Sequence, residues 1–358
     1  MRWAHVLALV AQCVATAACS GETATDTLDA AAPRDGAAPE AATPRDASGQ
    51  RDAQPPRDAG VDARAPDAGR ACSGPPYPIV LAHGFSGFES IGPINYYFRV
   101  AGDLRASGET VIEAVVSPYQ SSDVRARELG VVVDDALGST GACKVVIIAH
   151  SQGGIDVRTM IGSLGYGDRI AAAVTIATPH RGTKIADAVL GLVPGAPDAL
   201  LDFFALVVGR TISSAGDDPA LRASLESISI ANMTGPFVVE NPDDPRVAFY
   251  SVAGRTDLQH GDAVCADGLW PNSSRVDAVD PLLFATAEYL RERLIDPVVN
   301  DGLVTVESAK WGTFLGCVPA DHMDEVGQVA DLFPDVTSDW DHRDFYVKLV
   351  EFLHDEGF

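Results

Sequence analysis

Short apolar runs recur along the chain from residue 78 onwards, and amphipathic segments separate the first three of them. Residues 96–107 and 125–137 have the apolar spacing of helices with one buried face. Apolar runs with helices between them are typical of parallel strands that are covered on both faces. The pattern therefore predicts an α/β fold, with a mostly parallel central sheet and helices on both faces. The predicted strands are residues 78–82, 110–116, 144–149, 171–176 and 247–252.

The first 71 residues lack this pattern. Residues 1–19 start with one arginine and continue with small apolar residues, as an export signal does. Cys19 follows two alanines, which resembles the lipobox of bacterial lipoproteins, although Thr16 stands where that motif usually has Leu or Val. We interpret residues 1–19 as a lipoprotein-type signal peptide, which would make the protein an outer-membrane lipoprotein attached through Cys19. The alternative is plain signal cleavage, which would leave the protein secreted.

Residues 20–71 have the composition of a linker. They contain six prolines, no aromatic residue, and only Leu28 and Val61 as large aliphatic residues. Such a segment buries too little apolar area to offset the entropy of ordering it, and its prolines keep it extended. We predict a disordered Ala/Pro/Asp/Arg-rich linker that holds a folded catalytic domain, residues 72–358, away from a membrane. An exported linker without that role is the alternative.

The charge of the chain narrows the class of partner. The 358 residues include 26 Lys and Arg against 50 Asp and Glu, a net charge of −24. A polyanion would be repelled, which excludes nucleic-acid binding through phosphates and disfavours docking on anionic lipid. A neutral substrate that is bound through apolar surface fits better. After the N-terminus no apolar run reaches the ~20 residues that a membrane-spanning helix needs.

Four cysteines follow the linker, and export would place them in an oxidising compartment, where they form disulfides. Four cysteines allow three pairings. We favour Cys72–Cys143 and Cys265–Cys317, because Cys72 and Cys143 each precede a predicted strand and can meet at one edge of the sheet.

The strongest chemical signal is the segment Ala149-His150-Ser151-Gln152-Gly153, which joins a predicted strand to a helix. A G-x-S-x-G turn at such a junction, here with Ala at the first position, holds a serine hydroxyl above the edge of the sheet. A purely structural turn is the alternative. We predict Ser151 as a nucleophile and the backbone N–H of Gln152 as one oxyanion donor.

The second oxyanion donor should come from the loop after the first strand. His83-Gly84-Phe85 lies there, and we predict the N–H of Phe85, because Gly84 lets the chain approach closely. His83 precedes the turn and is predicted to be a structural hydrogen-bonding residue.

In hydrolases with this turn, the acid and then the base follow the serine along the chain. Asp301 lies in an Asn-Asp-Gly-Leu-Val turn after an apolar run and is the predicted acid, with Asp257 as a rival after another predicted strand. His322 is the predicted base. The other histidines after Ser151 are His180, His260, His342 and His354. His180 is predicted to be structural, and His342 and His354 are predicted to lie on a solvated helix face.

Six segments occur in the order and approximate spacing of one known family. They are PIVLAHGFSG, KVVIIAHSQGG, IATPHRGT, VDPLL, NDGLV and DHMDEVGQ. In these segments the chain resembles the bacterial family I lipases, which are calcium-binding and often foldase-assisted triacylglycerol lipases. The resemblance covers most of residues 77–332. It implies an α/β-hydrolase fold with a helical lid insertion, and the same nucleophile, acid, base and oxyanion donors as above.

The resemblance also implies one structural Ca²⁺ beside the catalytic base. Carried over by position, its ligands are the side chains of Asp280 and Asp324 and the carbonyls of Gln328 and Leu332. Hard oxygen ligands of this kind suit Ca²⁺. Without the resemblance, Asp280 before Pro281 would indicate a helix N-cap instead.

Residues 197–209 are apolar over too much of their surface for an ordinary exposed helix, and Pro and Gly bound them. Together with the resemblance, this predicts a lid that opens at a lipid–water interface, and a buried helix is the alternative. The chain also departs from the family. Asp156 lies five residues after Ser151, where an acid is unusual in the family, and we predict that its side chain points to solvent. Near Glu307 a cysteine of the family is replaced, so the family's disulfide is absent.

Two classes of function remain open. The first is a monomeric, exported serine lipase or carboxylesterase that hydrolyses neutral acyl esters, above all triacylglycerol, through an acyl-enzyme, with a lipase-specific foldase as a candidate partner. A short-chain esterase and a polyester depolymerase share this chemistry. The second is a non-catalytic surface binding protein on the same fold, which the complete set of serine, acid and histidine disfavours.

Overall fold

The computed structural model describes residues 72–358 except 88–89, 92–93, 194–197, 199, 201, 203–217, 257–261, 272, 294 and 329–339. Outside the described residues lie the predicted signal peptide and linker, Asp257, Leu332 and most of the predicted lid at 197–209.

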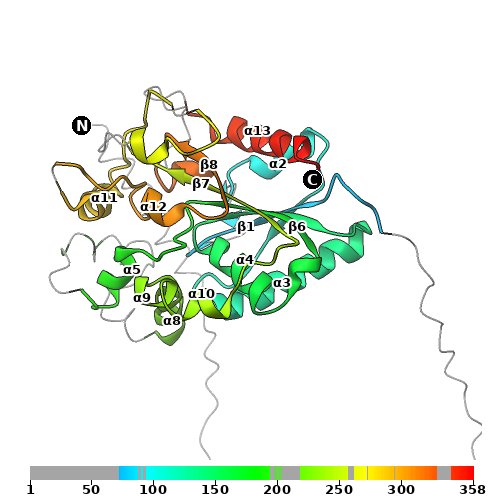
Figure 1. The fold of residues 1–358 in the computed structure, drawn as a ribbon, viewed down its shortest axis with the longest axis horizontal. Helices are drawn as coiled ribbons and strands as arrows, with labels where there is room; N and C mark the ends of the chain where they lie inside the picture. Colours follow the sequence, from blue (N-terminus) through cyan, green and yellow to red (C-terminus); the bar gives the residue numbers. More distant parts are fainter. Residues whose placement is uncertain are drawn as a thin grey trace, which may run out of the picture. The chain divides into compact units, whose positions relative to one another are not determined.

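Six parallel strands form the central sheet, in the order β4-β1-β5-β6-β7-β8 (Figure 1). All residues of β1, β5 and β6 are buried, because helices cover both faces of the sheet. The predicted parallel sheet is therefore confirmed. A separate antiparallel ribbon consists of β2 (Ser90–Ile91) and β3 (Ile94–Asn95). The strands of the main sheet are β1 (Ile79–Ala82), β4 (Val111–Ala114), β5 (Val145–His150), β6 (Ile170–Ile176), β7 (Ala248–Gly254) and β8 (Thr313–Val318).

The sequence pattern does not predict β8, which forms one edge of the sheet. Gly316 lies inside this strand with a φ of 140°, and a glycine weakens a strand signal. The pairing of β7 with β8 also shifts in register between Ser251 and Val252. The edge strand forms because pairing with β7 supplies the order that its own sequence lacks.

Helices lie on both faces of the sheet (Figure 1). On one face are α2 (Val100–Ala106) and α13 (His342–Asp355), and on the other are α3 (Ser122–Thr140) and α4 (Gln152–Gly162). α2 begins later than predicted, because Arg99 at its N-cap adopts a left-handed conformation.

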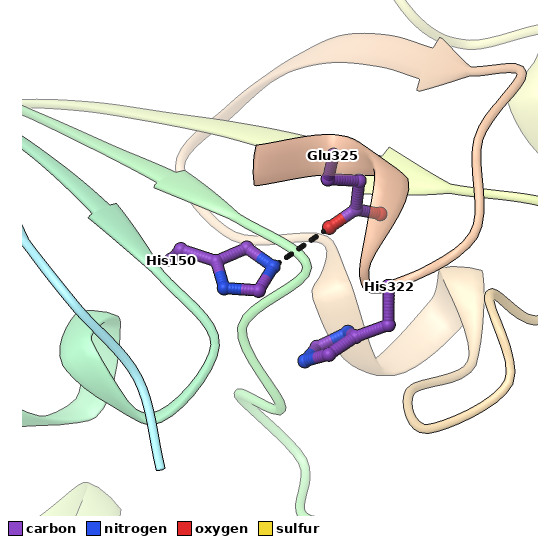
Figure 2. Close-up of side chains that lie close together, drawn as sticks. All are labelled: His150, His322 and Glu325. Carbon is purple, nitrogen blue, oxygen red and sulfur yellow. Dashed lines mark hydrogen bonds and ion pairs between the residues drawn. The ribbon is translucent and has the colours of Figure 1, made fainter. Parts of the chain in front are cut away.

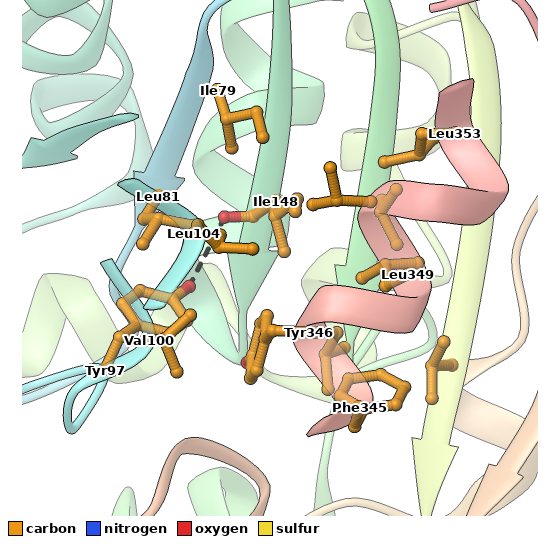
Figure 3. Close-up of a cluster of buried hydrophobic side chains, with 14 of the residues drawn as sticks. Ile79, Leu81, Tyr97, Val100, Leu104, Ile148, Phe345, Tyr346, Leu349 and Leu353 are labelled. Atoms are coloured by element: carbon orange, nitrogen blue, oxygen red, sulfur yellow. Dashed lines mark hydrogen bonds between the residues drawn. The ribbon is translucent and has the colours of Figure 1, made fainter. Parts of the chain in front are cut away.

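The apolar core under α13 joins the C-terminal helix to strands of the central sheet. Tyr346, Leu349 and Leu353 of this helix belong to one buried cluster with Ile79 of β1 and Ile148 of β5 (Figure 3). Helix α13 thus packs on β1 and β5 of the central sheet.

The position of His342 contradicts the prediction of a solvated face at the start of this helix. Its side chain is 3% exposed, and its Nε2 lies 2.9 Å from the carbonyl oxygen of Phe98. A Cβ at Gly327 would stand 2.3 Å from the same nitrogen. His342 itself is buried because the segments before α2 and after the candidate base pack against its ring, although Asp341 and Asp344 beside it are exposed. His354, at the other end of α13, is exposed as predicted.

Short helices surround a further apolar cluster, which contains Ile155 of α4 together with Leu200 and Leu283. Phe85 and Met323 pack against its border, so this cluster reaches the candidate site. The short helices of this cluster are α5 (Lys184–Val189), α8 (Pro219–Ser227), α9 (Ile230–Met233), α10 (Pro236–Glu240) and α11 (Phe284–Arg291). Other short elements pack on other parts of the core: α12 (Val306–Ala309), η1 (Tyr166–Asp168), η2 (Asp262–Cys265) and η3 (Asp324–Val326).

Both favoured disulfides are confirmed. Cys72 and Cys143 are bonded with their Cα atoms 4.8 Å apart, and Cys265 and Cys317 are bonded with theirs 5.6 Å apart. The first pair ties the start of the described chain to the segment before β5. Among the described helices, none combines the length and the hydropathy that crossing a membrane requires.

Candidate active site

Ser151 stands at the turn between β5 and α4. Its φ of 55° and ψ of −131° lie in a region that a residue with a side chain adopts only under strain. A Cβ at Gly84 would stand 2.6 Å from the Cβ of Ser151, and a Cβ at Gly153 would stand 2.6 Å from the carbonyl oxygen of Ala82. Glycine at these positions therefore lets the loop after β1 approach the turn. The turn presents the hydroxyl of Ser151 at the end of its strand.

The structure brings the three predicted catalytic residues together. The Oγ of Ser151 lies 3.0 Å from Nε2 of His322, and Nδ1 of His322 lies 2.8 Å from Oδ2 of Asp301. Because a carboxylate can only accept, Nδ1–H of His322 donates to Asp301, and Nε2 is left to accept from the hydroxyl of Ser151. This is the arrangement in which an imidazole can remove a proton from a serine.

Backbone groups orient Asp301. Its Oδ1 accepts the N–H of Leu303 at 2.8 Å and that of Val304 at 2.7 Å, which leaves Oδ2 for the imidazole. The N–H of His322 donates to the carbonyl oxygen of Asp301 at 2.9 Å. Gly302 makes this turn possible with a φ of 101°. The acid and the base are thus held by main chain as well as by each other.

A cavity of about 90 Å³ opens over Ser151. Phe85 and Leu303 line it, together with Met323 and Val326 from the loop of the base. Among the described residues that line it, none is Lys, Arg, Asp or Glu. The cavity therefore suits a neutral, apolar ligand. A larger cavity of about 520 Å³, between α3, α8, α9 and α10, contains none of the three catalytic candidates.

The predicted oxyanion residues lie on the two segments that meet at this cavity. Gln152 is the first residue of α4, and its side chain is bound elsewhere, with Oε1 accepting from Ser224 Oγ at 2.9 Å and Nε2 donating to the carbonyl of Gln120 at 3.2 Å. The ring of Phe85 packs edge-on against Tyr119, with centroids 5.3 Å apart. Both residues can therefore contribute only backbone groups to an oxyanion.

A buried polar network that the sequence analysis did not identify lies behind the base. Nε2 of His150 is 3.0 Å from Oε2 of Glu325, and the hydroxyl of Tyr96 is 2.7 Å from Nδ1 of His150. The ring of His150 also packs on that of His322, with centroids 4.5 Å apart (Figure 2). Two features of the sequence could have indicated this network. His150 directly precedes Ser151, and Glu325 follows His322 by three residues.

Burial shifts the pKa values of His150 and Glu325 away from their ordinary range. It lowers the pKa of His150 well below its usual value, with the neighbouring His322 acting in the same direction. It raises the pKa of Glu325 well above its usual value, and the nearby carboxylates of Asp301, Asp321 and Asp324 add to this. His150 is therefore a neutral imidazole at neutral pH.

His150, His322 and Glu325 also form a group that could hold a metal, since their ligand atoms lie within 4.8 Å of one another (Figure 2). Both ring nitrogens of His322 are already engaged with Ser151 and Asp301. A metal there would displace the catalytic arrangement, so we interpret the group as a hydrogen-bond network.

The predicted calcium ligands are partly brought together. Oδ1 of Asp280 accepts the N–H of Leu282 at 2.7 Å, which is the capping bond that the alternative interpretation expects. The N–H of Asp280 also donates to Oδ2 of Asp321 at 2.7 Å, and Oδ1 of Asp321 accepts the N–H of Asp324 at 3.1 Å. Asp321 thus links the segments of the two predicted carboxylate ligands. Gln328 lies on the same loop, where its Nε2 donates to the carbonyl of Tyr96 at 3.0 Å.

The chemistry of this corner fits a hard cation. Asp280, Asp321 and Asp324 concentrate carboxylate oxygens next to the loop of His322. Burial, with a contribution from Asp280, raises the pKa of Asp321 to about 6. A divalent cation would offset this accumulation of negative charge, and oxygen donors are those that Ca²⁺ prefers.

Asp156 does not point to solvent, so that prediction is wrong. Its side chain is 1% exposed and accepts from Nε of Arg125 at 2.7 Å, and Arg125 is itself completely buried. Burial raises the pKa of Asp156 to about 6, and the guanidinium of Arg125 acts in the opposite direction. A charge is buried only beside a partner, and here the partner lies on another helix, where sequence spacing does not reveal it.

Two further histidines are structural, as predicted. Nε2 of His83 accepts the N–H of Val116 at 3.2 Å, and burial lowers its pKa to about 4. Nε2 of His180 lies 2.9 Å from Oγ1 of Thr175, and burial lowers its pKa well below the usual value. Neither ring faces the cavity over Ser151.

No protein-family model matches the sequence. The chain is 33% identical over 164 residues to the triacylglycerol lipase of Pseudarthrobacter phenanthrenivorans, a match that covers 43% of this chain and 51% of that protein. It is 37% identical over 118 residues to the triacylglycerol lipase of Vibrio cholerae serotype O1, covering 33% of this chain and 37% of that protein. The chain thus spans about half, or less, of the length of these relatives.

Among solved structures, the lipase of Staphylococcus hyicus superposes with a TM-score of 0.56 at 17% identity, covering 80% of this chain and 98% of that one. The mature lipase BlEst2 of Bacillus licheniformis superposes with a TM-score of 0.54 at 18% identity, covering 76% of this chain and 91% of that one. The predicted α/β-hydrolase fold is confirmed. The resemblance to bacterial lipases that the sequence motifs indicate is confirmed as well.

Proposed function

We propose that this protein is an exported serine lipase or carboxylesterase that hydrolyses neutral acyl esters, with triacylglycerol as the leading substrate. The observation that carries the proposal is the bonded series from Ser151 through His322 to Asp301, at the base of an apolar cavity. The sequence relatives, which are named triacylglycerol lipases, support the same chemistry.

In the proposed reaction, Nε2 of His322 takes the proton of the Ser151 hydroxyl while Oγ attacks the ester carbonyl. Asp301 keeps Nδ1 protonated and stabilises the imidazolium that forms. His322 then returns the proton to the leaving alcohol, and an acyl-enzyme remains on Ser151. Water, activated by the same imidazole, hydrolyses the acyl-enzyme and restores the serine.

The negative oxygen of the tetrahedral intermediate would be bound by the backbone N–H groups of Phe85 and Gln152. Gln152 stands at the first turn of α4, where the helix dipole favours negative charge. Preorganised amides of this kind stabilise the transition state more than the ground state.

We further propose that one Ca²⁺ binds the side chains of Asp280 and Asp324 and the carbonyls of Gln328 and Leu332. The bound ion would stabilise the loop that carries His322 and would take no part in proton transfer. The carboxylates that meet around Asp321 support this assignment.

Export, with attachment through Cys19 or free secretion, is part of the proposal, as are a monomeric state and a candidate foldase partner. Two disulfides support export, because they persist in oxidising compartments. The lid predicted at 197–209 remains a prediction.

The first test compares hydrolysis of emulsified long-chain triacylglycerol with hydrolysis of a soluble short-chain ester, by the exported protein and its Ser151→Ala variant. Ser163→Ala, after the end of α4, is the matched control. We expect hydrolysis of the emulsion that depends on Ser151. Activity on the soluble ester alone would favour the esterase alternative, and activity on neither would favour the binding-protein alternative.

A further inference from the structure

The side chain of Arg125 is completely buried, and it makes four hydrogen bonds around the loop of the predicted oxyanion donor. Nη1 donates to the carbonyl of Ser117 at 2.7 Å. Nη2 donates to the carbonyls of His83 at 2.8 Å and Gly84 at 3.2 Å. Nε donates to Asp156 at 2.7 Å. One guanidinium therefore joins two loops to helix α4.

The bond to Gly84 has a consequence for its neighbour. The C=O of Gly84 and the N–H of Phe85 belong to the same peptide group, which is planar and trans, so the two bonds point in opposite directions. A donor that holds the Gly84 oxygen thereby sets the direction of the Phe85 N–H. Arg125 therefore bonds the end of this peptide group that lies opposite to the Phe85 N–H.

His83 holds the same carbonyl. Its Nε2 accepts the N–H of Val116 at 3.2 Å, so the proton of the neutral ring is on Nδ1, which donates to the oxygen of Gly84 at 3.0 Å. Burial lowers the pKa of His83 to about 4, which keeps this tautomer neutral at neutral pH. The Gly84 oxygen thus accepts from both Arg125 and His83.

Asp156 connects this arrangement to the other oxyanion donor. It lies on α4, one turn after Gln152, whose N–H is the second predicted donor. The two oxyanion amides come from different segments, Phe85 from the loop after β1 and Gln152 from the start of α4. No short stretch of covalent chain therefore fixes the distance between them. The Arg125–Asp156 pair supplies this link through two buried side chains.

We propose that Arg125 is a positioning residue for ester hydrolysis, which sets the direction of the Phe85 N–H through the Gly84 carbonyl and its separation from Gln152 through Asp156. The inference rests on the proposed function, because it assigns Arg125 a role in stabilising the oxyanion. Arg125 touches neither substrate nor Ser151, and it acts only through the loop.

The test uses the double variant Arg125→Met/Asp156→Leu, which removes both charges and leaves none unpaired. Replacement of a buried ion pair by apolar side chains often preserves stability. The matched control is Arg158→Met, because Arg158 is another buried arginine of the same region but packs on Phe237 and Trp311. Hydrolysis of a soluble ester and hydrogen exchange of the backbone at 83–87 are measured for each protein.

We expect kcat of the double variant to fall about 10- to 100-fold, with KM nearly unchanged, since removing an oxyanion donor outright costs about 10²- to 10³-fold. Exchange at 83–87 should become faster. Arg158→Met should keep both kcat and the exchange rates, even if it melts earlier. A double variant with the kcat and exchange of the original protein would overturn the proposal.

Arg125→Lys keeps the charge but reaches fewer acceptors, and it serves if the double variant does not fold. We expect an intermediate kcat and an intermediate exchange rate, and values equal to those of the original protein would count against the proposal. Failure of the proposed function is a separate result: the original protein would then show no hydrolysis that depends on Ser151.

Discussion

Ser151 lies between two buried polar regions that hold charge in different ways. On the side of the base, Asp301, Asp321 and Glu325 gather around histidines, and in the described part of the chain none of these three carboxyls forms an ion pair with Arg or Lys. On the side of the oxyanion loop, Arg125 is paired with Asp156 and bound to three backbone carbonyls.

The difference matches what each side would do in the reaction. His322 gains and loses a positive charge in each half-reaction, and the carboxylate of Asp301 at its Nδ1 stabilises that transient cation. The oxyanion amides must keep their direction while charge develops, and a permanently charged, fully bonded guanidinium suits that task. One side is therefore built to change its charge and the other to hold its geometry.

The largest effect is expected on the side of the base, from Asp301→Asn. The amide cannot keep His322 in the required tautomer, and we expect kcat to fall about 10⁴-fold while the melting temperature changes little. Asp267→Asn, on the surface, is the control. Activity within tenfold of the original would exclude Asp301 as the acid and turn attention to Asp257.

On the side of the oxyanion loop, Asp156→Asn should affect stability rather than chemistry. It weakens the partner of a buried arginine, so we expect a loss of about 3–5 kcal/mol in the free energy of unfolding, measured with urea. Because the amide oxygen of the asparagine can still accept from Nε of Arg125, the link to α4 persists, and Arg125 also keeps its carbonyl bonds. The kcat should therefore remain within a few-fold. A loss of kcat as large as that of Asp301→Asn would end the distinction between the two sides.

Removal of Ca²⁺ should affect only the side of the base. At a thousand times its Kd, a bound ion stabilises the folded state by about 4 kcal/mol, so a chelator should lower the melting temperature. Asp324→Asn should abolish this response and Asp156→Asn should retain it. If the chelator does not change the melting temperature, Asp280 acts only as a helix cap.

The smallest effect concerns pH on the side of the oxyanion loop. The pKa of His83 falls from its ordinary 6.5 to about 4 in the folded state, so the unfolded state binds more protons between these values. The stability contributed by His83 is present above pH 6.5 and is lost as the pH falls towards 4, up to about 3 kcal/mol.

The measurement is the difference in unfolding free energy between the original protein and His83→Gln, determined with urea from pH 7 to pH 4. Other titrating groups largely cancel in this difference, which should shrink as the pH falls. His354→Gln, on the exposed end of α13, is the control for replacing a histidine that is not buried. A constant difference for His83→Gln would mean that His83 titrates normally.

Local pattern was enough for much of the fold and of the candidate site. The apolar runs predict β1, β5 and β6, because strands buried on both faces must be apolar along their whole length. They also predict β4 and β7, which are buried over only part of their length. The strand–turn–helix around Ser151 and the order of acid and base reflect chain geometry over a few residues. The pattern does not predict β8, because Gly316 interrupts its apolar run. The strand forms through its pairing with β7.

The sequence by itself determined which residues could carry chemistry: a serine in a strained turn, an acid in a glycine turn, a histidine on a following loop, and cysteines placed to pair. Only the tertiary structure decided that Asp156 lies buried against Arg125, that His150 and Glu325 back the base, and that His342 is covered. The physical reason is that a buried polar group depends on partners from distant segments, and the free energy of that pairing leaves no period or spacing in the chain.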